Sequence, residues 1–317
     1  MILTLTPNPS VDHTLEVDRL IRGEVLRVGS TRAQPGGKGV NVARALHLAG
    51  ADTRAILPVG GGGGAELTTL LGDLPRLTVP IEGETRANVA VTETDGTTTK
   101  LNAPGPHLSP AETDSLLAAL EDELSERPAW VVASGSLPAG AGDDLYVRVA
   151  ELAAAHGVAL ALDTSGKPLE AAVNAGSVAL VKPNLEELSE LSGRPLTDVG
   201  EVTAAARELI ALGNGSVLVT LGGHGAILVG PEHVWWARGP RVRTRSTVGA
   251  GDCALAGFLI PADSPVERLR HAVAWGTAAV SLPGTTIPSP DDVNVDAVEV
   301  VPDPDPTWPI DSLVDRP

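Results

Sequence analysis

Three apolar runs decide the fold class of this chain: VALALD at Val158–Asp163, VALVK at Val178–Lys182 and SVLVTL at Ser216–Leu221. Each run has the length of a strand, and stretches rich in Ala, Leu and Glu, such as Glu201–Leu212, lie beside them. Apolar strands that alternate with helices are typical of a parallel sheet covered by helices on both faces. This region therefore predicts an α/β fold.

The same alternation continues toward the N-terminus and predicts more elements of the same sheet. We assign residues 1–300 to one domain built on it. The strand-length runs are Met1–Thr6, Thr53–Val59 and Trp130–Ala133, and the helical patterns are Val40–Leu48, Ala65–Leu71 and Asp143–Ala155.

Two segments break the alternation and predict a small separate β-layer. Asp12–Gln34 and Arg86–Leu101 have the pattern of short alternating strands, and Asp95–Gly96 is a hairpin turn signal. Because these segments lie between helices of the main series, we expect them to form a lid, at about residues 12–34 and 86–103. The apolar face of the lid needs a cover, which either the main domain or a second subunit would supply.

Glycine and proline mark two further segments. Gly60–Gly64 is a run of glycines that predicts a flexible turn, and no Gly-Lys-Ser/Thr follows it, which excludes a P-loop. Prolines recur after Leu282, so we expect residues 301–317 to form an extended surface tail rather than another domain.

Composition excludes several classes of protein. The net charge of −17 over 317 residues disfavours binding to a nucleic-acid backbone. Cys253 is the single cysteine, so the chain has neither an internal disulfide nor a cysteine zinc site. Pro7 and Pro9 interrupt the place of a secretory signal, and no apolar run approaches the roughly 18–20 residues of a membrane helix. We expect a soluble cytoplasmic protein without a membrane partner.

The strongest local motif is Thr247-Val248-Gly249-Ala250-Gly251-Asp252, which precedes a helical pattern. Glycines at the start of a helix let backbone amides converge on an anion, and the positive helix end adds to the attraction. A carboxylate beside such an anion hole suits phosphoryl transfer to a hydroxyl group. The alternative is an acidic residue that only stabilises the helix dipole.

A second glycine-rich segment, Pro35-Gly36-Gly37-Lys38-Gly39-Val40-Asn41, also precedes a helix. Asp12 follows the first strand, where open α/β sheets bind ligands. Carboxylate, amide and ammonium groups together suit a polyol that bears an anionic group. Arg86 is a candidate second contact to phosphate. The alternative is that it is only a charged residue on the surface.

Three more motifs follow strands. Lys182-Pro183-Asn184-Leu185-Glu186-Glu187 is either a capping box or an oxygen site for hydrated Mg²⁺. Thr220-Leu221-Gly222-Gly223-His224-Gly225 permits a close approach to the backbone. Ser136 in Ser134-Gly135-Ser136-Leu137-Pro138 is a candidate donor to a sugar oxygen, and no Gly-x-Ser-x-Gly elbow of a serine hydrolase surrounds it.

In this order, the motifs resemble those of the ribokinase-like, PfkB-type sugar kinases. The similarity covers roughly residues 1–290 and is greatest to the phosphosugar branch of 1-phosphofructokinase type. It implies a three-layer α/β/α sandwich with a mainly parallel sheet, a β-sheet lid often used to form homodimers, and MgATP as the phosphoryl donor.

The resemblance also implies a role for each matching residue. It makes Asp252 the general base, and Gly249, Ala250 and Gly251 the anion hole. It assigns Asp12, Gly37, Lys38, Asn41, Arg86 and Ser136 to the sugar phosphate, Lys182, Asn184, Thr220, Gly222 and Gly225 to ATP, and Glu187 with Asn184 to Mg²⁺.

One position departs from the family pattern. The motif Thr85-Arg86-Ala87-Asn88 is part of the resemblance, and many relatives have a lysine two residues after its Asn, where this chain has Ala90. The phosphate contact on the strand that contains this motif is therefore expected to come from elsewhere. Lys100 on the following strand is a candidate, and Arg27, contributed across a dimer, is another.

The reaction expected from these residues is phosphorylation of fructose 1-phosphate to fructose 1,6-bisphosphate. The alternatives are the same chemistry on fructose 6-phosphate or tagatose 6-phosphate and, more remotely, a non-catalytic sugar-phosphate sensor. A sensor would keep the sugar site and lose Asp252 or Glu187, and both are present. An NAD-linked oxidoreductase is disfavoured because its glycine motif lies late in the chain, with no acidic residue near position 271.

Overall fold

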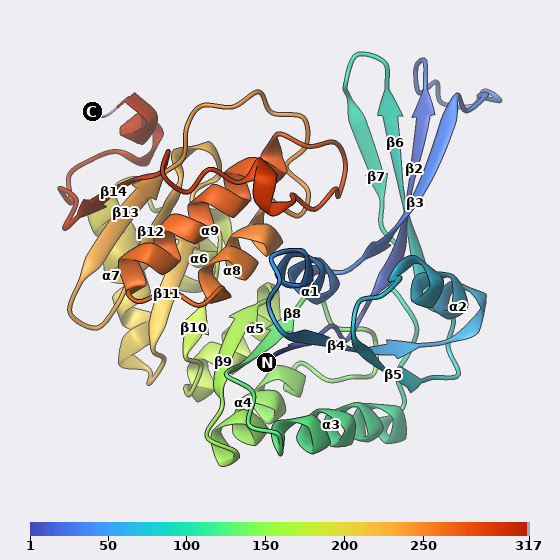
Figure 1. Ribbon diagram of the computed structural model, residues 1–317, viewed down its shortest axis with the longest axis horizontal. Coiled ribbons are helices and arrows are strands. Elements are labelled where there is room, and N and C mark those ends of the chain that lie inside the picture. Colours follow the sequence, from blue (N-terminus) through green and yellow to red (C-terminus); the bar gives the residue numbers. More distant parts are fainter. Residues whose placement is uncertain (316–317) are drawn as a thin grey trace.

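The computed structural model describes residues 1–315 and contains two sheets (Figure 1). The larger sheet has ten strands, which are parallel from β5 to β11 and antiparallel from β11 to β14. In spatial order they are β14 (Glu299–Pro302), β13 (Val234–Arg238), β12 (Ala226–Val229), β11 (Ser216–Thr220), β10 (Leu180–Val181), β9 (Ala159–Asp163), β8 (Trp130–Ser134), β1 (Ile2–Leu5), β4 (Thr53–Val59) and β5 (Arg76–Pro80).

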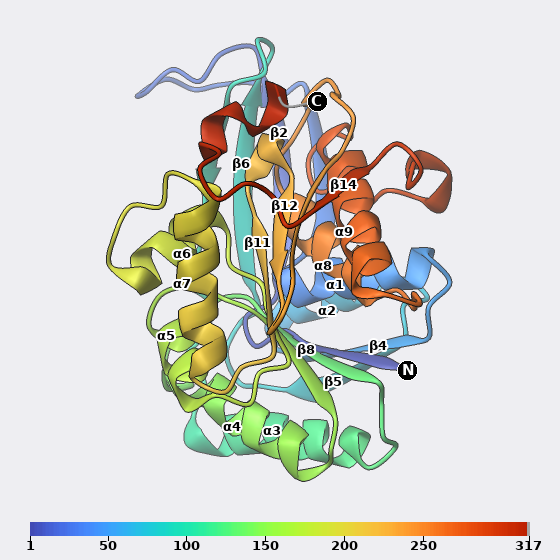
Figure 2. The ribbon, with the colours of Figure 1, turned by 90° about the vertical axis from the view of Figure 1, so that its left-hand side faces the viewer.

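Helices cover both faces of this sheet (Figure 2), which confirms the predicted three-layer fold. Alternate residues of one strand enter opposite cores: Val217 and Val219 of β11 join one hydrophobic cluster and Leu218 joins the other. This two-sided burial is why the strands are apolar throughout. One face carries α3 (Pro110–Leu124), α4 (Leu145–Ala155), α5 (Gly166–Ala175), α6 (Leu185–Ser192) and α7 (Val199–Ala211), and the other carries α1 (Lys38–Leu48), α2 (Gly61–Leu70), α8 (Ala250–Leu259) and α9 (Pro265–Val280).

The predicted lid is a separate four-stranded sheet that rises above the main body (Figure 1). Its central strands β2 and β6 are parallel, and each forms an antiparallel pair with an outer strand. The turn at Asp95–Gly96 connects β6 and β7 as expected, and Asp95 accepts a hydrogen bond from the Thr97 amide at 2.8 Å. In order, the strands are β3 (Ser30–Gly36), β2 (Ser10–Val17), β6 (Arg86–Glu93) and β7 (Thr98–Leu101).

The prediction of a flexible turn at Gly60–Gly64 is wrong, because α2 begins at Gly61. The loop that precedes β6 packs directly on this first turn. The Gly60 amide donates to Thr85 Oγ1 at 3.0 Å, and the Gly63 amide donates to Glu84. A Cβ atom at Gly60 or Gly63 would overlap backbone oxygens of this loop, so the glycines permit close packing rather than flexibility.

The proline-rich end of the chain lies on the main body. β14 pairs with β13, and it spans the expected domain boundary at residue 300. Further along, Trp308 packs edge-on against Trp236 with ring centroids 6.2 Å apart, and the Ile310 amide donates to Thr197 O. Short 3₁₀ turns lie at η2 (Pro290–Asp292) and η3 (Ile310–Asp315). Within residues 1–315, no helix is long and apolar enough to cross a membrane.

Candidate active site

A cleft of about 2150 Å³ lies between the lid and the carboxyl edge of the main sheet. Strands β8, β9 and β10 are parallel neighbours, so the residues that end or follow them meet at this edge. The chain passes from β1 to β4 on one side, and β8 lies on the other side of β1. Open α/β sheets bind ligands where the strand order reverses in this way.

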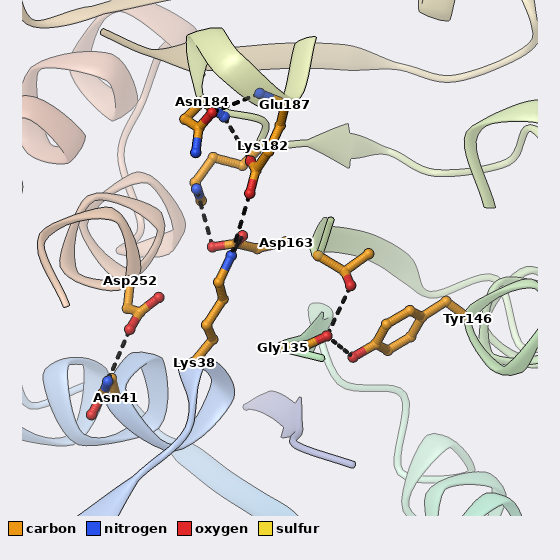
Figure 3. Close-up of polar contacts among 10 residues, drawn as sticks. Lys38, Asn41, Gly135, Tyr146, Asp163, Lys182, Asn184, Glu187 and Asp252 are labelled. Atoms are coloured by element: carbon orange, nitrogen blue, oxygen red, sulfur yellow. Dashed lines mark hydrogen bonds and ion pairs between the residues drawn. The ribbon is translucent and has the colours of Figure 1, made fainter. Parts of the chain in front are cut away.

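Asp252 lies in the first turn of α8 and lines the cleft, and its side chain points toward Asn41 (Figure 3). Gly249 precedes the helix with a φ of 79°, a left-handed conformation that glycine adopts without strain. The first helical hydrogen bond runs from the Cys253 amide to Gly249 O, so the amides of Gly251 and Asp252 have no acceptor within the helix. A carboxylate and free amides therefore lie together at a positive helix end.

The environment of Asp252 favours its neutral form. The carboxyl is 7% exposed, and burial, together with the negative charge of Asp163, raises its pKa to about 6. Asn41 Nδ2 donates to Asp252 Oδ2 at 2.9 Å, which orients the carboxylate and partly offsets the rise. A carboxylate with this pKa is ionised at neutral pH and is still basic enough to accept a proton.

A second carboxylate, Asp163 at the end of β9, lies between two lysines (Figure 3). Lys38 Nζ donates to Asp163 Oδ1 at 2.7 Å, and Lys182 Nζ lies 3.0 Å from Asp163 Oδ2. Asp163 is 1% exposed and Lys182 4% exposed, whereas 37% of the Lys38 side chain is open to the cleft. Burial opposes the ionisation of Asp163, but the charges of Lys182 and Lys38 outweigh it and hold its pKa below the ordinary value. The cluster thus keeps one net positive charge beside the cleft, suited to a polyphosphate.

Asn184 and Glu187 form the capping box that the sequence allowed. Asn184 Oδ1 accepts from the Glu187 amide, and Glu187 Oε2 accepts from the Asn184 amide, both at 2.8 Å. Glu187 Oε1 remains directed at the cleft, 3.9 Å from Lys38 Nζ. Capping therefore leaves one carboxylate oxygen of Glu187 available to a ligand.

The side-chain oxygens at this place could hold a magnesium ion only if phosphate oxygens of a ligand supplied further contacts. Among the described residues, no group of three or more His, Cys, Asp or Glu side chains is arranged to hold a metal. Mg²⁺ usually keeps several waters and binds one or two carboxylates together with substrate phosphates. Glu187 Oε1, which the capping box does not use, fits that mode, whereas both oxygens of Asp163 contact lysines.

On the lid side, Asp12 is the centre of a polar group at the base of β2. Its Oδ1 accepts from Ser10 Oγ at 2.7 Å and from Asn88 Nδ2 at 2.9 Å. Asn8, on the segment before β2, donates from Nδ2 to Ser136 Oγ at 3.3 Å. These groups present one carboxylate and several hydroxyl and amide groups to the cleft, which suits recognition of a polyol.

Arg86 reaches the cleft, but two of its donors are engaged elsewhere. Its Nη1 donates to Ala103 O at 2.8 Å and its Nη2 donates to Asn8 O at 3.0 Å. The Nε–H is buried and has no hydrogen-bond partner among the residues that the structure describes. In this arrangement the guanidinium connects two loops at the base of the lid.

The cleft brings every site residue predicted from the sequence together. Arg27, one of the two substitutes considered for the position of Ala90, does not line the cleft, whereas Lys100 does. The lining includes Asp12, Gly37, Lys38, Asn41, Arg86, Ser136, Lys182, Asn184, Glu187, Thr220, Gly222, Gly225, Gly249, Ala250, Gly251 and Asp252.

Sequence reasoning assigned no role to several polar residues of the site, among them Asp163, Asn8, Ser10 and Asn88. Asp163 ends the apolar run VALALD, and a carboxylate at the carboxyl end of a buried parallel strand is a signal that could have found it. Asn88 belongs to the Thr85-Arg86-Ala87-Asn88 motif, but its contact with Asp12 depends on the pairing of β6 with β2.

Comparison with known proteins agrees with this geometry. The family described as pfkB family carbohydrate kinase matches residues 6–292. The chain is 40% identical over 282 residues to 1-phosphofructokinase of Xanthomonas campestris, covering 87% of this chain and 88% of the relative. It is 38% identical over 299 residues to ATP-dependent 6-phosphofructokinase isozyme 2 of Mycobacterium tuberculosis, covering 92% and 87%. The crystal structure of phosphofructokinase-2 from Escherichia coli in complex with potassium superposes with a TM-score of 0.86 at 36% identity, over 92% of this chain and 96% of that one.

Proposed function

Because the chain belongs to the pfkB family of carbohydrate kinases, we propose that it phosphorylates fructose 1-phosphate with ATP, giving fructose 1,6-bisphosphate and ADP. The observation that carries the reaction class is the buried carboxylate of Asp252 beside unpaired helix amides, in one cleft with the lysine pair of Asp163. The choice of acceptor is supported by the motif resemblance and by the 1-phosphofructokinase relative.

In the proposed reaction, Asp252 accepts the proton of the C6 hydroxyl as its oxygen attacks the terminal phosphorus of ATP. The new bond joins the sugar oxygen to that phosphorus, and the bond to the β,γ-bridging oxygen breaks, which leaves ADP. Asn41 holds the carboxylate in place for the transfer. The amides at the start of α8 stabilise the negative charge on the phosphoryl group as it moves.

The nucleotide phosphates are assigned to the side of the cleft that the main body forms, away from the lid. Lys182 is held by Asp163, so its ammonium group needs little reorganisation when a polyphosphate arrives. Lys38, which contacts the same carboxylate, is assigned to the sugar substrate. Thr220, Gly222 and Gly225 would line the rest of the ATP site, in and beside the 3₁₀ turn η1 (Gly222–His224). Glu187 and Asn184 are the residues proposed to hold Mg²⁺, which would neutralise negative charge on the nucleotide phosphates.

Fructose 6-phosphate is the second candidate acceptor. The specific observation in its favour is that the M. tuberculosis 6-phosphofructokinase relative is as similar to the chain, at 38% identity, as the 1-phosphofructokinase relatives. Tagatose 6-phosphate remains a third. These acceptors differ mainly in the position of the phosphate and in one stereocentre.

A side-by-side assay tests the proposal. Initial rates with MgATP are measured for fructose 1-phosphate, fructose 6-phosphate and tagatose 6-phosphate, with ADP release coupled to NADH oxidation. The highest kcat/KM with fructose 1-phosphate supports the proposed acceptor, and a higher value with another sugar phosphate replaces it. If none turns over but calorimetry detects binding, the protein is a sensor.

We further propose that the chain forms a homodimer through the lid and acts in the cytoplasm. Support for the dimer comes from five exposed aliphatic side chains in or beside the lid, one of them, Val25, 96% exposed. A related E. coli phosphofructokinase-2 has been solved in a tetrameric inhibited form. Light scattering after size exclusion tests it, and Val25→Asp should shift the mass toward one chain. The five residues are Leu20, Ile21, Val25, Val28 and Leu101.

A further inference from the structure

The strand register of the lid places three rows of side chains across the side that faces the cleft. Directly paired residues of neighbouring strands point to the same face of a sheet, and every member of these rows lines the cleft. From the base of the lid toward its tip, the rows are Gln34–Asp12–Asn88, Arg32–Thr14–Ala90–Lys100 and Ser30–Glu16–Thr92–Thr98.

The middle row has a cation at each end and small side chains between them. Arg32 on β3 pairs with Thr14, Thr14 pairs with Ala90, and Ala90 pairs with Lys100 on β7. With strands about 4.8 Å apart, the backbones of the two outer residues lie about 14 Å from each other. Two long basic side chains can converge from that separation on an anion seated above the threonine and alanine.

Both cations of the row are exposed, and within residues 1–315 neither makes a salt bridge. The acidic side chains of the adjoining rows are engaged by neighbours: Asp12 accepts from Ser10 and Asn88, and Glu16 accepts from Ser30 Oγ at 2.6 Å. In a protein with a net charge of −17, two unpaired cations facing a ligand cleft mark a place for an anion.

Arg86 is less well suited to that anion, because its two terminal nitrogens donate to the carbonyls of Ala103 and Asn8. The small side chain of Ala90 leaves space where a longer one would stand. Its direct neighbour on β7, Lys100, supplies the positive charge from the adjacent strand.

We infer that Arg32 and Lys100 bind the phosphate group that the acceptor sugar already carries, and that they set the preference for a sugar phosphate over a free sugar. The inference depends on the proposed function. With the acceptor hydroxyl at Asp252 and the sugar hydroxyls beside Asp12, the existing phosphate extends along the lid to the next row, about 7 Å farther out.

Binding of fructose 1-phosphate and of free fructose to the full-length protein tests the inference. Calorimetry and steady-state kinetics are run on Arg32→Ala, Lys100→Ala and the double variant, with Lys100→Arg as the charge-conserving control. Each alanine variant should weaken fructose 1-phosphate binding and raise its KM by about 10-fold to 100-fold, because a charge-assisted hydrogen bond is lost. The KM for ATP and the affinity for fructose should stay unchanged, and Lys100→Arg should restore most of the binding. Arg22→Ala removes a lid cation outside the cleft and should change nothing.

The outcomes separate the two proposals. Equal losses of fructose and fructose 1-phosphate binding would indicate a structural role and overturn the inference. So would unchanged binding in Arg32→Ala and Lys100→Ala together with weakened binding in Arg27→Ala. Either result leaves the proposed function standing if the wild-type protein phosphorylates a ketohexose phosphate. If the wild type binds these sugar phosphates without turnover, the kinase proposal fails, and the binding comparison still decides the role of the row.

Discussion

The cluster around Asp163 and the middle row of the lid hold their charges in opposite ways. Asp163 and Lys182 are almost fully buried, and each has an oppositely charged partner within 3.0 Å. Arg32 and Lys100 are exposed on a sheet that stands apart from the main body. Paired buried charges are already oriented for a ligand, whereas exposed cations can be replaced by other residues with little effect on the stability of the fold. On the proposed function, the buried charges of the main body would bind the phosphates of the donor, and the exposed cations of the lid would distinguish one acceptor sugar from another.

Among the residues of the main body, the largest effect on activity is expected when the charge of Asp252 is removed. Asp252→Asn should lower kcat by on the order of 10²–10⁴, because the amide cannot accept the proton of the acceptor hydroxyl. Coupled-assay kcat and the calorimetric Kd for ATP are the measurements, and the ATP affinity should be largely retained. Near-normal turnover in this variant would remove Asp252 from the mechanism.

The charge pairing of the cluster itself is tested by Asp163→Asn. This change leaves Lys182 buried without its counter-charge and should lower the free energy of unfolding by about 3–5 kcal/mol at pH 7–8. Urea titration measures it. The control is Asp114→Asn, whose 2.6 Å ion pair with Arg148 is exposed and should contribute no more than about 1 kcal/mol.

The pH dependence of the Asp163→Asn effect follows from the lowered pKa of Asp163. The carboxylate stabilises the fold at pH values above its ordinary pKa and loses that contribution as acid protonates it. The difference between wild type and Asp163→Asn should therefore shrink in acid. Similar unfolding free energies for Asp163→Asn and Asp114→Asn at neutral pH would contradict the contrast between cluster and surface.

Protonation of Asp252 should appear as an acidic limb in the activity profile. Its pKa is raised to about 6, so the base is ionised above that pH and kcat/KM should fall about tenfold for each unit below it. The profile is measured from pH 5 to 8 with saturating MgATP. A kcat/KM that stays level down to pH 5 would contradict the prediction and would mean that the carboxyl is more hydrated than its burial indicates.

The smallest effect is expected on the lid. Lys100→Ala should change the free energy of unfolding by no more than about 0.5 kcal/mol, since its side chain is exposed and makes no salt bridge with any residue that the structure describes. Lys182→Ala, which removes a buried cation from Asp163, is the matched comparison and should cost several-fold more. Equal costs for the two lysine variants would mean that the lid is as tightly organised as the body.

Much of this architecture follows from local sequence patterns. Two-sided burial makes the strands apolar throughout, which indicates the fold class. The segment Gly249-Ala250-Gly251-Asp252 before an apolar helical pattern marks the start of α8 and singles out Asp252. These features depend on neighbours only a few positions away in the chain, where propensity and periodicity act.

Other features depend on which strands become neighbours. Lys38 meets Asp163 across 125 positions of sequence, Arg86 meets the carbonyl of Asn8 across 78, and Ala90 comes to lie beside Lys100 through the pairing of β6 with β7. Gly61–Gly64 are helical, and the loop that precedes β6 packs against the start of this helix. Such contacts are set by long-range packing and register, and a single sequence carries no local signal for them.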